Sequence, residues 1–102
     1  MPPPWKLPGR SSARWRMPEV SRFFGIIIRF YYRDHPPIHF HAIYGEHEGL
    51  VEIETGKLHQ GFLPAKALEL VNQWRLLHLE ELREDWKRAS GNLPLLPIRP
   101  LE

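Results

Sequence analysis

The chain has 102 residues, of which 42% are hydrophobic and 25% charged, and this is enough for one domain with its own core. There are fourteen Lys and Arg against twelve Asp and Glu, and there is no cysteine. The composition excludes a disulfide framework, a thiolate metal site and a thiol nucleophile. No apolar run approaches the roughly 20 residues of a membrane span, so we expect a cytoplasmic protein that does not act at a membrane.

The first sixteen residues differ from the rest of the chain. They carry four basic residues and no acidic one, and their prolines, glycine and serines break helix and strand alike. Residues 17–102 therefore hold ten basic and twelve acidic residues, a formal charge of −2, which weakens any general argument for nucleic-acid binding. We expect residues 1–16 to be a disordered, basic, Pro-rich extension, or Met17 to be the real start. Residues 17–102 should form a single domain.

The central part of the sequence predicts an antiparallel sheet. Its segments are rich in β-branched and aromatic residues, or alternate between apolar and polar residues, and turn residues separate them. The expected strands are residues 25–33, 38–44, 50–55 and, as a short fourth strand, 58–62. Residues 45–49 should form a hairpin loop, because both ends of this segment are glycines.

From Ala65 to about Ser90 the sequence predicts one long helix. The segment lacks Gly and Pro, is rich in Leu, Glu, Lys and Arg, and places apolar residues at helical spacing. Trp74 and Trp86 lie on this apolar stripe and should face the sheet. At about 1.5 Å per residue such a helix is long for so small a sheet, so it should overhang the sheet or bend.

Gly91 and Asn92 offer a left-handed end to the helix, and three prolines in residues 93–102 predict an extended strap docked on the core. The expected fold class is α+β: a three- to four-stranded antiparallel meander packed on one long C-terminal helix.

Four stretches of residues 17–102 stand out as a set. They are Met17–Ile26, Asp34–His41 with its proline and HFH run, Trp74–Trp86, and Pro100–Glu102. In this order they resemble the small bacterial family called domain of unknown function 4160, although here Ile38 separates the prolines from His39. The resemblance implies a stand-alone bacterial domain, often encoded beside another small domain of unknown function (number 2442), an arrangement suggestive of toxin–antitoxin modules. It assigns no catalytic residue.

One face of the predicted sheet carries the residues that metal-independent RNA cleavage needs. If the apolar side of each strand packs on the helix, the other side displays Arg29, Tyr31, Arg33, His39, His41, Glu52 and Glu54. Such a set supplies a base for the 2′-hydroxyl, an acid for the leaving 5′-oxygen, arginines for the phosphorane charge and a tyrosine to stack on a base. The alternative interpretation is a solvated face with cross-strand Arg–Glu pairs.

His39 and His41 have the spacing that places two imidazoles on one side of a strand. This spacing suits metal chelation, with Glu52 or Glu54 joining from the next strand, or an exposed pair that supports the Pro-Pro turn. Without cysteine we expect no closed structural metal site and no cofactor, and any bound metal should be weak and keep open positions. If the pair functions, proton transfer is the expected role. His78 on the helix should be a hydrogen-bonded core residue.

Two hypotheses about function follow. The first is an RNA-acting component of a toxin–antitoxin-like module, with the polar sheet face as its site. The second is a non-enzymatic interaction module, the neutralising or scaffolding partner of such a pair, which the acidic balance of residues 17–102 favours. The expected partners are RNA or a small protein encoded nearby. Enzymatic activity and oligomeric state stay open.

Overall fold

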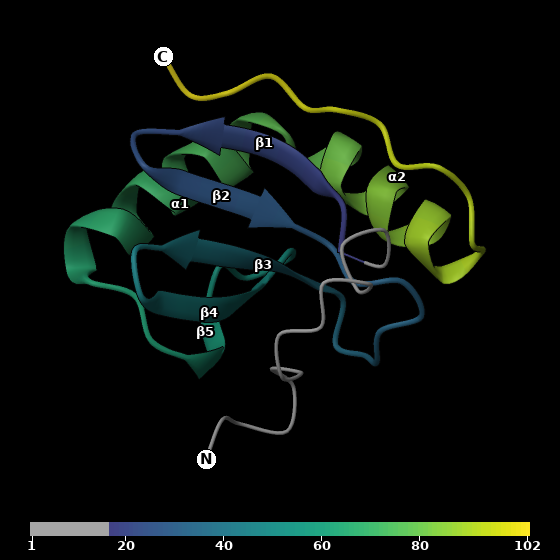
Figure 1. Ribbon diagram of the computed structural model, residues 1–102, viewed down its shortest axis with the longest axis horizontal. Helices are drawn as coiled ribbons and strands as arrows, with labels where there is room; N and C mark the ends of the chain where they lie inside the picture. Colours follow the sequence, from purple (N-terminus) through teal and green to yellow (C-terminus); the bar gives the residue numbers. More distant parts are fainter. Residues whose placement is uncertain (1–16) are drawn as a thin grey trace.

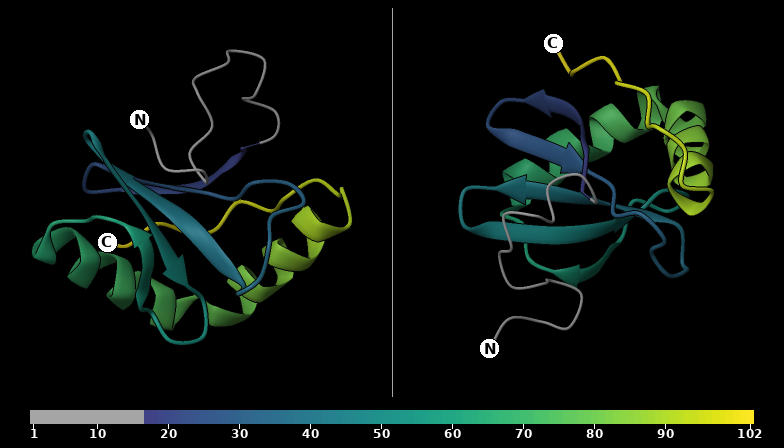
Figure 2. Two further views of the ribbon diagram at one scale, coloured as in Figure 1. Left: turned by 90° about the horizontal axis from the view of Figure 1, so that it is seen from below. Right: turned by 45° about the vertical axis from the view of Figure 1, so that its right-hand side comes forward.

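The computed structural model describes residues 17–102, so the expected N-terminal extension lies outside the described residues. One antiparallel sheet has its strands in chain order, and two helices lie on one side of it (Figures 1 and 2). The elements are β1 (Glu19–Phe23), β2 (Ile26–Arg29), β3 (His39–Tyr44), β4 (His47–Glu52), β5 (Leu58–Gly61), α1 (Ala65–Leu77) and α2 (Leu79–Ser90). The expected α+β class and antiparallel order are therefore confirmed.

The sheet has five strands, and the expectation of three or four was wrong because it missed β1. The strand breaks the two-residue alternation that the sequence analysis relied on. A bulge between Glu19 and Ser21 makes Val20 and Ser21 buried neighbours, although consecutive residues of a regular strand point to opposite faces. The later strands begin or end within a few residues of the expected bounds, and the β3–β4 connection is a tight turn at Gly45-Glu46.

The prediction of a single long helix was also wrong, because the segment forms two helices. The bend that was expected is a complete break. His78 has φ −131° and ψ 30°, outside the helical region, and it separates α1 from α2. The break lets α1 run across one side of the sheet, while α2 turns towards the N-terminal end of β3 (Figure 2). Within the described residues, neither helix combines the length and apolar character that crossing a bilayer requires.

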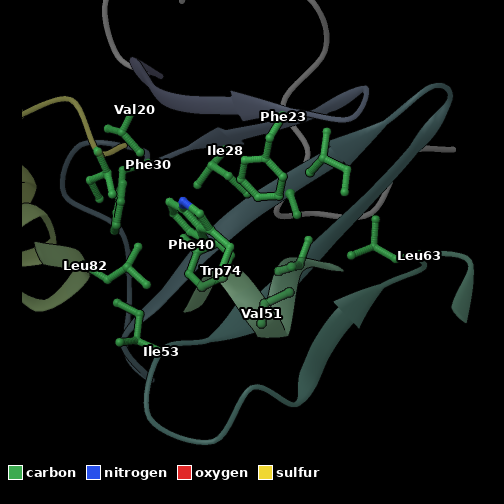
Figure 3. Close-up of a cluster of buried hydrophobic side chains, with 14 of the residues drawn as sticks. Val20, Phe23, Ile28, Phe30, Phe40, Val51, Ile53, Leu63, Trp74 and Leu82 are labelled. Carbon is green, nitrogen blue, oxygen red and sulfur yellow. The ribbon is translucent and has the colours of Figure 1, made fainter. Parts of the chain in front are cut away.

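Trp74 on α1 is at the centre of the core (Figure 3), fully buried between the rings of Phe23 and Phe40. Its indole Nε1–H donates a hydrogen bond of 2.8 Å to the carbonyl of Arg99 in the C-terminal strap. The strap also pairs with β1, because the Ile98 N–H donates to the Val20 carbonyl at 2.8 Å. The predicted docking of the strap is confirmed, and so is the burial of Trp74 against the sheet.

Candidate functional site

The segment between β2 and β3 folds back over the N-terminal end of β3, where His39 lies. Its backbone is fixed at two points, since the Phe30 N–H donates to the Pro18 carbonyl and the Arg33 N–H donates to the Ala89 carbonyl at the end of α2. Arg33 has φ +57°, a left-handed conformation that reverses the chain direction just before Asp34. The reversal brings the Asp34 carboxylate back to the two histidines of β3.

Asp34 joins the two histidines through a single oxygen atom. Its Oδ2 lies 2.8 Å from Nε2 of His39 and 3.1 Å from Nε2 of His41. The other oxygen, Oδ1, accepts the backbone N–H of His35 at 2.9 Å. Both ring atoms that the histidines direct towards this end of the sheet therefore converge on one carboxylate oxygen.

The opposite nitrogens of the two rings also have partners. Nδ1 of His39 lies 2.7 Å from the Pro37 carbonyl, and Nδ1 of His41 lies 3.1 Å from Oε2 of Glu48. Tyr31 stacks on the His41 ring at a centroid distance of 4.0 Å, and its hydroxyl donates to the same Glu48 oxygen at 3.4 Å. We call this set the Asp34 centre; it consists of Tyr31, Asp34, His39, His41 and Glu48.

The histidines are buried, whereas the sequence analysis expected them to be displayed on a polar face. His39 is 3% exposed and His41 1%. The strand alternation itself is as expected, because Phe40 between them packs on Trp74 of α1. The difference arises from what covers them: Tyr31 lies on His41, and Trp86 of α2 lies 5.2 Å from His39 between ring centroids. Trp86 is therefore half-buried at the end of the sheet.

The electrostatics of the centre favour a charged Asp34 carboxylate and a charged His41 imidazole. Burial raises the pKa of Asp34, but hydrogen bonds from His39, His41 and the His35 N–H outweigh it and hold this pKa well below its usual range. Burial lowers the pKa of His41, and the carboxylates of Asp34 and Glu48 outweigh it, so the net shift is upward. Burial, followed by the nearby Glu48 charge, raises the pKa of Tyr31. The carboxylates of Asp34 and Glu48 therefore flank the His41 ring on its two sides.

A pocket of about 110 Å³ opens beside the centre. Asp34 and His39 line it, together with two histidines outside the centre, His35 from the β2–β3 segment and His59 from β5. Both of these histidines are exposed. The remaining lining residues are Pro36, Pro37, Leu50 and Gln60. The pocket gives solvent a route to Asp34 and His39.

Of the predicted site residues, the structure brings together only Tyr31, His39 and His41. Arg29 donates to the Met17 carbonyl and pairs with Glu19, and Arg33 is exposed in the β2–β3 segment. Glu52 accepts the Thr55 hydroxyl and lies near His59. Glu54 pairs with Arg83 of α2. The expected single polar face is therefore divided among several separate ion pairs. His78 is hydrogen-bonded as expected, through Nδ1 to Glu81 at 2.6 Å, but it lies at the break between the helices and is not one of the buried core residues.

The site residues predicted from the sequence did not include Asp34 and Glu48, whose carboxylates are the two negative charges of the centre. A usable signal existed for Glu48, because a two-residue turn at Gly45-Glu46 pairs it with Ile43, on the same face as His41. The loop expected there, residues 45–49, included Glu48 itself, so the pairing of Glu48 with Ile43 was not predicted. Asp34 was interpreted only as part of the strand end.

Comparison with models of protein families gives a match. The model of a family described as a domain of unknown function (DUF4160) matches residues 25–87, a span that contains the whole Asp34 centre. No curated protein and no solved structure matches the chain.

Proposed function

We propose that this chain, which belongs to the family of domain of unknown function 4160, acts on RNA at the pocket beside Asp34, as one component of a toxin–antitoxin-like module. The observation that carries the proposal is the convergence of Asp34 and His39 under a pocket whose walls also hold His35 and His59. Titratable groups of this kind, gathered in a cleft, are typical of catalytic sites.

The lining of the pocket favours the RNA backbone over a base. The residues that line this pocket of about 110 Å³ include no tryptophan, tyrosine or phenylalanine on which a base could stack. Tyr31 does not serve as a base-stacking platform, because its ring already stacks on His41. The RNA would therefore be engaged through its backbone, with its bases lying outside the pocket.

Proton transfer is best assigned to His35 and His59. Both ring nitrogens of His39 and of His41 already have partners, so this pair positions Asp34 and is not free to exchange protons with substrate. His35 and His59 are exposed and line the pocket, and imidazole is the side chain that most often serves in general acid–base catalysis. Their roles replace those expected for His39 and His41.

The test is cleavage of a fluorescent oligoribonucleotide by the full chain, with a deoxyribonucleotide of the same sequence as substrate control. His59→Ala should reduce the cleavage rate at least tenfold, in line with loss of a general acid or base. His47→Ala is the matched control, because His47 is also exposed but lies at the β3–β4 turn against Phe62, outside the pocket. Equal rates for the two variants, or equal cleavage of DNA, would contradict the proposal.

A second function, a non-enzymatic interaction module, has its own supporting observation. Leu76 and Leu77 at the end of α1 are 64% and 68% exposed, which leaves apolar side chains free for a partner, and residues 17–102 have a formal charge of −2. In the cleavage assay this alternative predicts no activity. It also predicts that the chain protects cells from growth arrest by a protein encoded beside it, and that Leu77→Glu abolishes the protection.

A further inference from the structure

We propose that Asp34 and the two histidines of β3 form a binding site for a divalent transition-metal ion, with Oδ2 of Asp34 and Nε2 of His39 and His41 as ligands. The inference rests on the proposed function only for the identity of the substrate that would contact the ion. The geometry of the ligand atoms does not depend on that function. The proposed site departs from the expectation from sequence, which was weak metal binding at most, with Glu52 and Glu54 as completing ligands and without Asp34.

Two of the three separations between the ligand atoms fit coordination of one metal ion. They all lie within 4.8 Å of one another, and this is the single such group of three found among residues 17–102. Metal bonds of about 2.1 Å at right angles place neighbouring ligand atoms about 3.0 Å apart. The two distances from Asp34 Oδ2, 2.8 Å and 3.1 Å, match this value. Two histidines and one carboxylate are also a recurrent ligand set that leaves coordination positions open.

Hydrogen bonds to the far side of each ring orient the histidines for this role. The Pro37 carbonyl can only accept, so at 2.7 Å Nδ1 of His39 donates to it, and a bound ion would replace the proton that Nε2 directs at Asp34. The Glu48 carboxylate has the same effect on His41. Histidines that ligate metals nearly always donate their other ring N–H to a carboxylate or a carbonyl. Both partners are present here.

The local charge suits a divalent cation. Asp34 and Glu48 bring two carboxylates to a site where the imidazoles are 1% and 3% exposed, so a 2+ ion would balance them. Two imidazole ligands favour Zn²⁺, Mn²⁺ or a similar ion over Mg²⁺ and Ca²⁺, which prefer all-oxygen sites. Asp34 and His39 both line the pocket, so the open positions would be accessible from it. There the ion would polarise a phosphate oxygen.

The experiment is titration of the full, tag-free and metal-free chain with ZnCl2, MnCl2 and MgCl2 in a calorimeter. We expect one Zn²⁺ per chain, weaker binding of Mn²⁺ in the Irving–Williams order, and no heat from Mg²⁺ beyond dilution. Asp34→Asn and His41→Ala should each weaken Zn²⁺ binding at least 100-fold. Glu48→Gln, which removes only the orienting partner of His41, should weaken it 10- to 100-fold.

Controls separate the site from surface histidines. His47→Ala and His59→Ala should retain the Zn²⁺ affinity of the unchanged chain within threefold, and circular dichroism of each metal-free variant checks its fold. In the unchanged chain, ¹⁵N NMR of the rings should show Zn²⁺ shifting Nε2 of His39 and His41 while Nδ1 keeps its proton. This readout holds even where a substituted protein fails to fold.

Failure of this inference differs from failure of the proposed function. Absence of stoichiometric Zn²⁺ binding, or ring shifts confined to His47 and His59, would overturn the metal site even if RNA is cleaved. Stoichiometric binding at His39 and His41 without RNA cleavage would uphold the metal site and overturn the RNA proposal.

Discussion

Two carboxylates, Asp34 and Asp85, each tie an irregular segment to the folded core, yet they do so in opposite electrostatic environments. Asp34 holds the β2–β3 segment and accepts hydrogen bonds from two imidazoles, which keep its pKa well below the usual range despite burial. Asp85 on α2 holds the strap, since its Oδ1 accepts the Leu96 N–H at 2.8 Å. Its Oδ2 is buried without a hydrogen-bond partner, and burial is the main cause that raises the pKa of Asp85 to about 6.

The surroundings of Asp85 also show that a density of acidic residues does not make a cation site. A pocket of about 240 Å³ lies between α2 and the strap, with walls formed by Leu96, Pro97, Ile98 and acidic residues of α2. Three of those acids already have cationic or imidazole partners: Glu80 with Arg83, Glu81 with His78, and Glu84 with Arg88. Asp34 differs because its own partners are atoms that a metal ion can use.

The largest effect should come from removing the Asp34 carboxylate. Asp34→Ala leaves two buried imidazoles without the oxygen on which both converge, and breaking a buried ionic contact in this way costs about 4 kcal/mol. Urea unfolding of the metal-free chain at pH 7 measures the loss. The matched control is Glu84→Ala, an exposed carboxylate on α2, which should change the unfolding free energy by under about 0.5 kcal/mol. Similar losses in both variants would erase the distinction between the two regions.

The sequence predicts the fold better than it predicts the site, and particular residues show why. Alternation and helical spacing are local signals, so β2 to β5 and the helical segment 65–90 were all found near their true bounds. The bulge at Glu19–Ser21 and the break at His78 were not, because each is a departure from periodicity set by packing. Strand β1 could be found only by knowing its partner.

The Asp34 centre depends on contacts between residues that no local pattern joins. His39 and His41 could be singled out from their spacing, but their burial depends on Tyr31 folding back and on Trp86 arriving from α2. Asp34 reaches them only because Arg33 reverses the chain with a positive φ, which nothing in its residue type announces. Glu54 is likewise separated from the Asp34 centre because it pairs with Arg83, and this pairing depends on the position of α2.

Asp85 should make the protein less stable as the pH rises, whereas Asn at this position should not. Its pKa in the folded chain, about 6, exceeds the ordinary 3.8, so its stabilising contribution is complete below about pH 4 and is lost as the pH rises through 6. Asp85→Asn keeps an oxygen for the Leu96 N–H. The variant should match the unchanged chain at pH 4 and exceed its unfolding free energy by at most about 3 kcal/mol at pH 7.

Urea unfolding at pH 4, 5, 6 and 7 measures this difference, and Glu69→Gln, at an exposed position on α1, serves as the control. The control should show no comparable rise between pH 4 and 7. If the difference in unfolding free energy between Asp85→Asn and the unchanged chain were the same at every pH, ionisation of the buried Asp85 carboxylate would not destabilise the fold.

The smallest effect concerns Tyr31, and it asks whether the Asp34 centre is held by its hydroxyl or by its ring. Tyr31→Phe removes a hydrogen bond to Glu48 that is long, at 3.4 Å, but keeps the stack on His41 at 4.0 Å, so it should cost about 0.5–1 kcal/mol. Tyr31→Ala removes the ring as well, uncovers His41 and should cost clearly more. Tyr44→Phe, at the exposed end of β3, is the control and should be neutral. If Tyr31→Phe lowered the unfolding free energy as much as Tyr31→Ala does, the hydrogen bond from the Tyr31 hydroxyl to Glu48, and not the stacked ring, would be what keeps His41 in place.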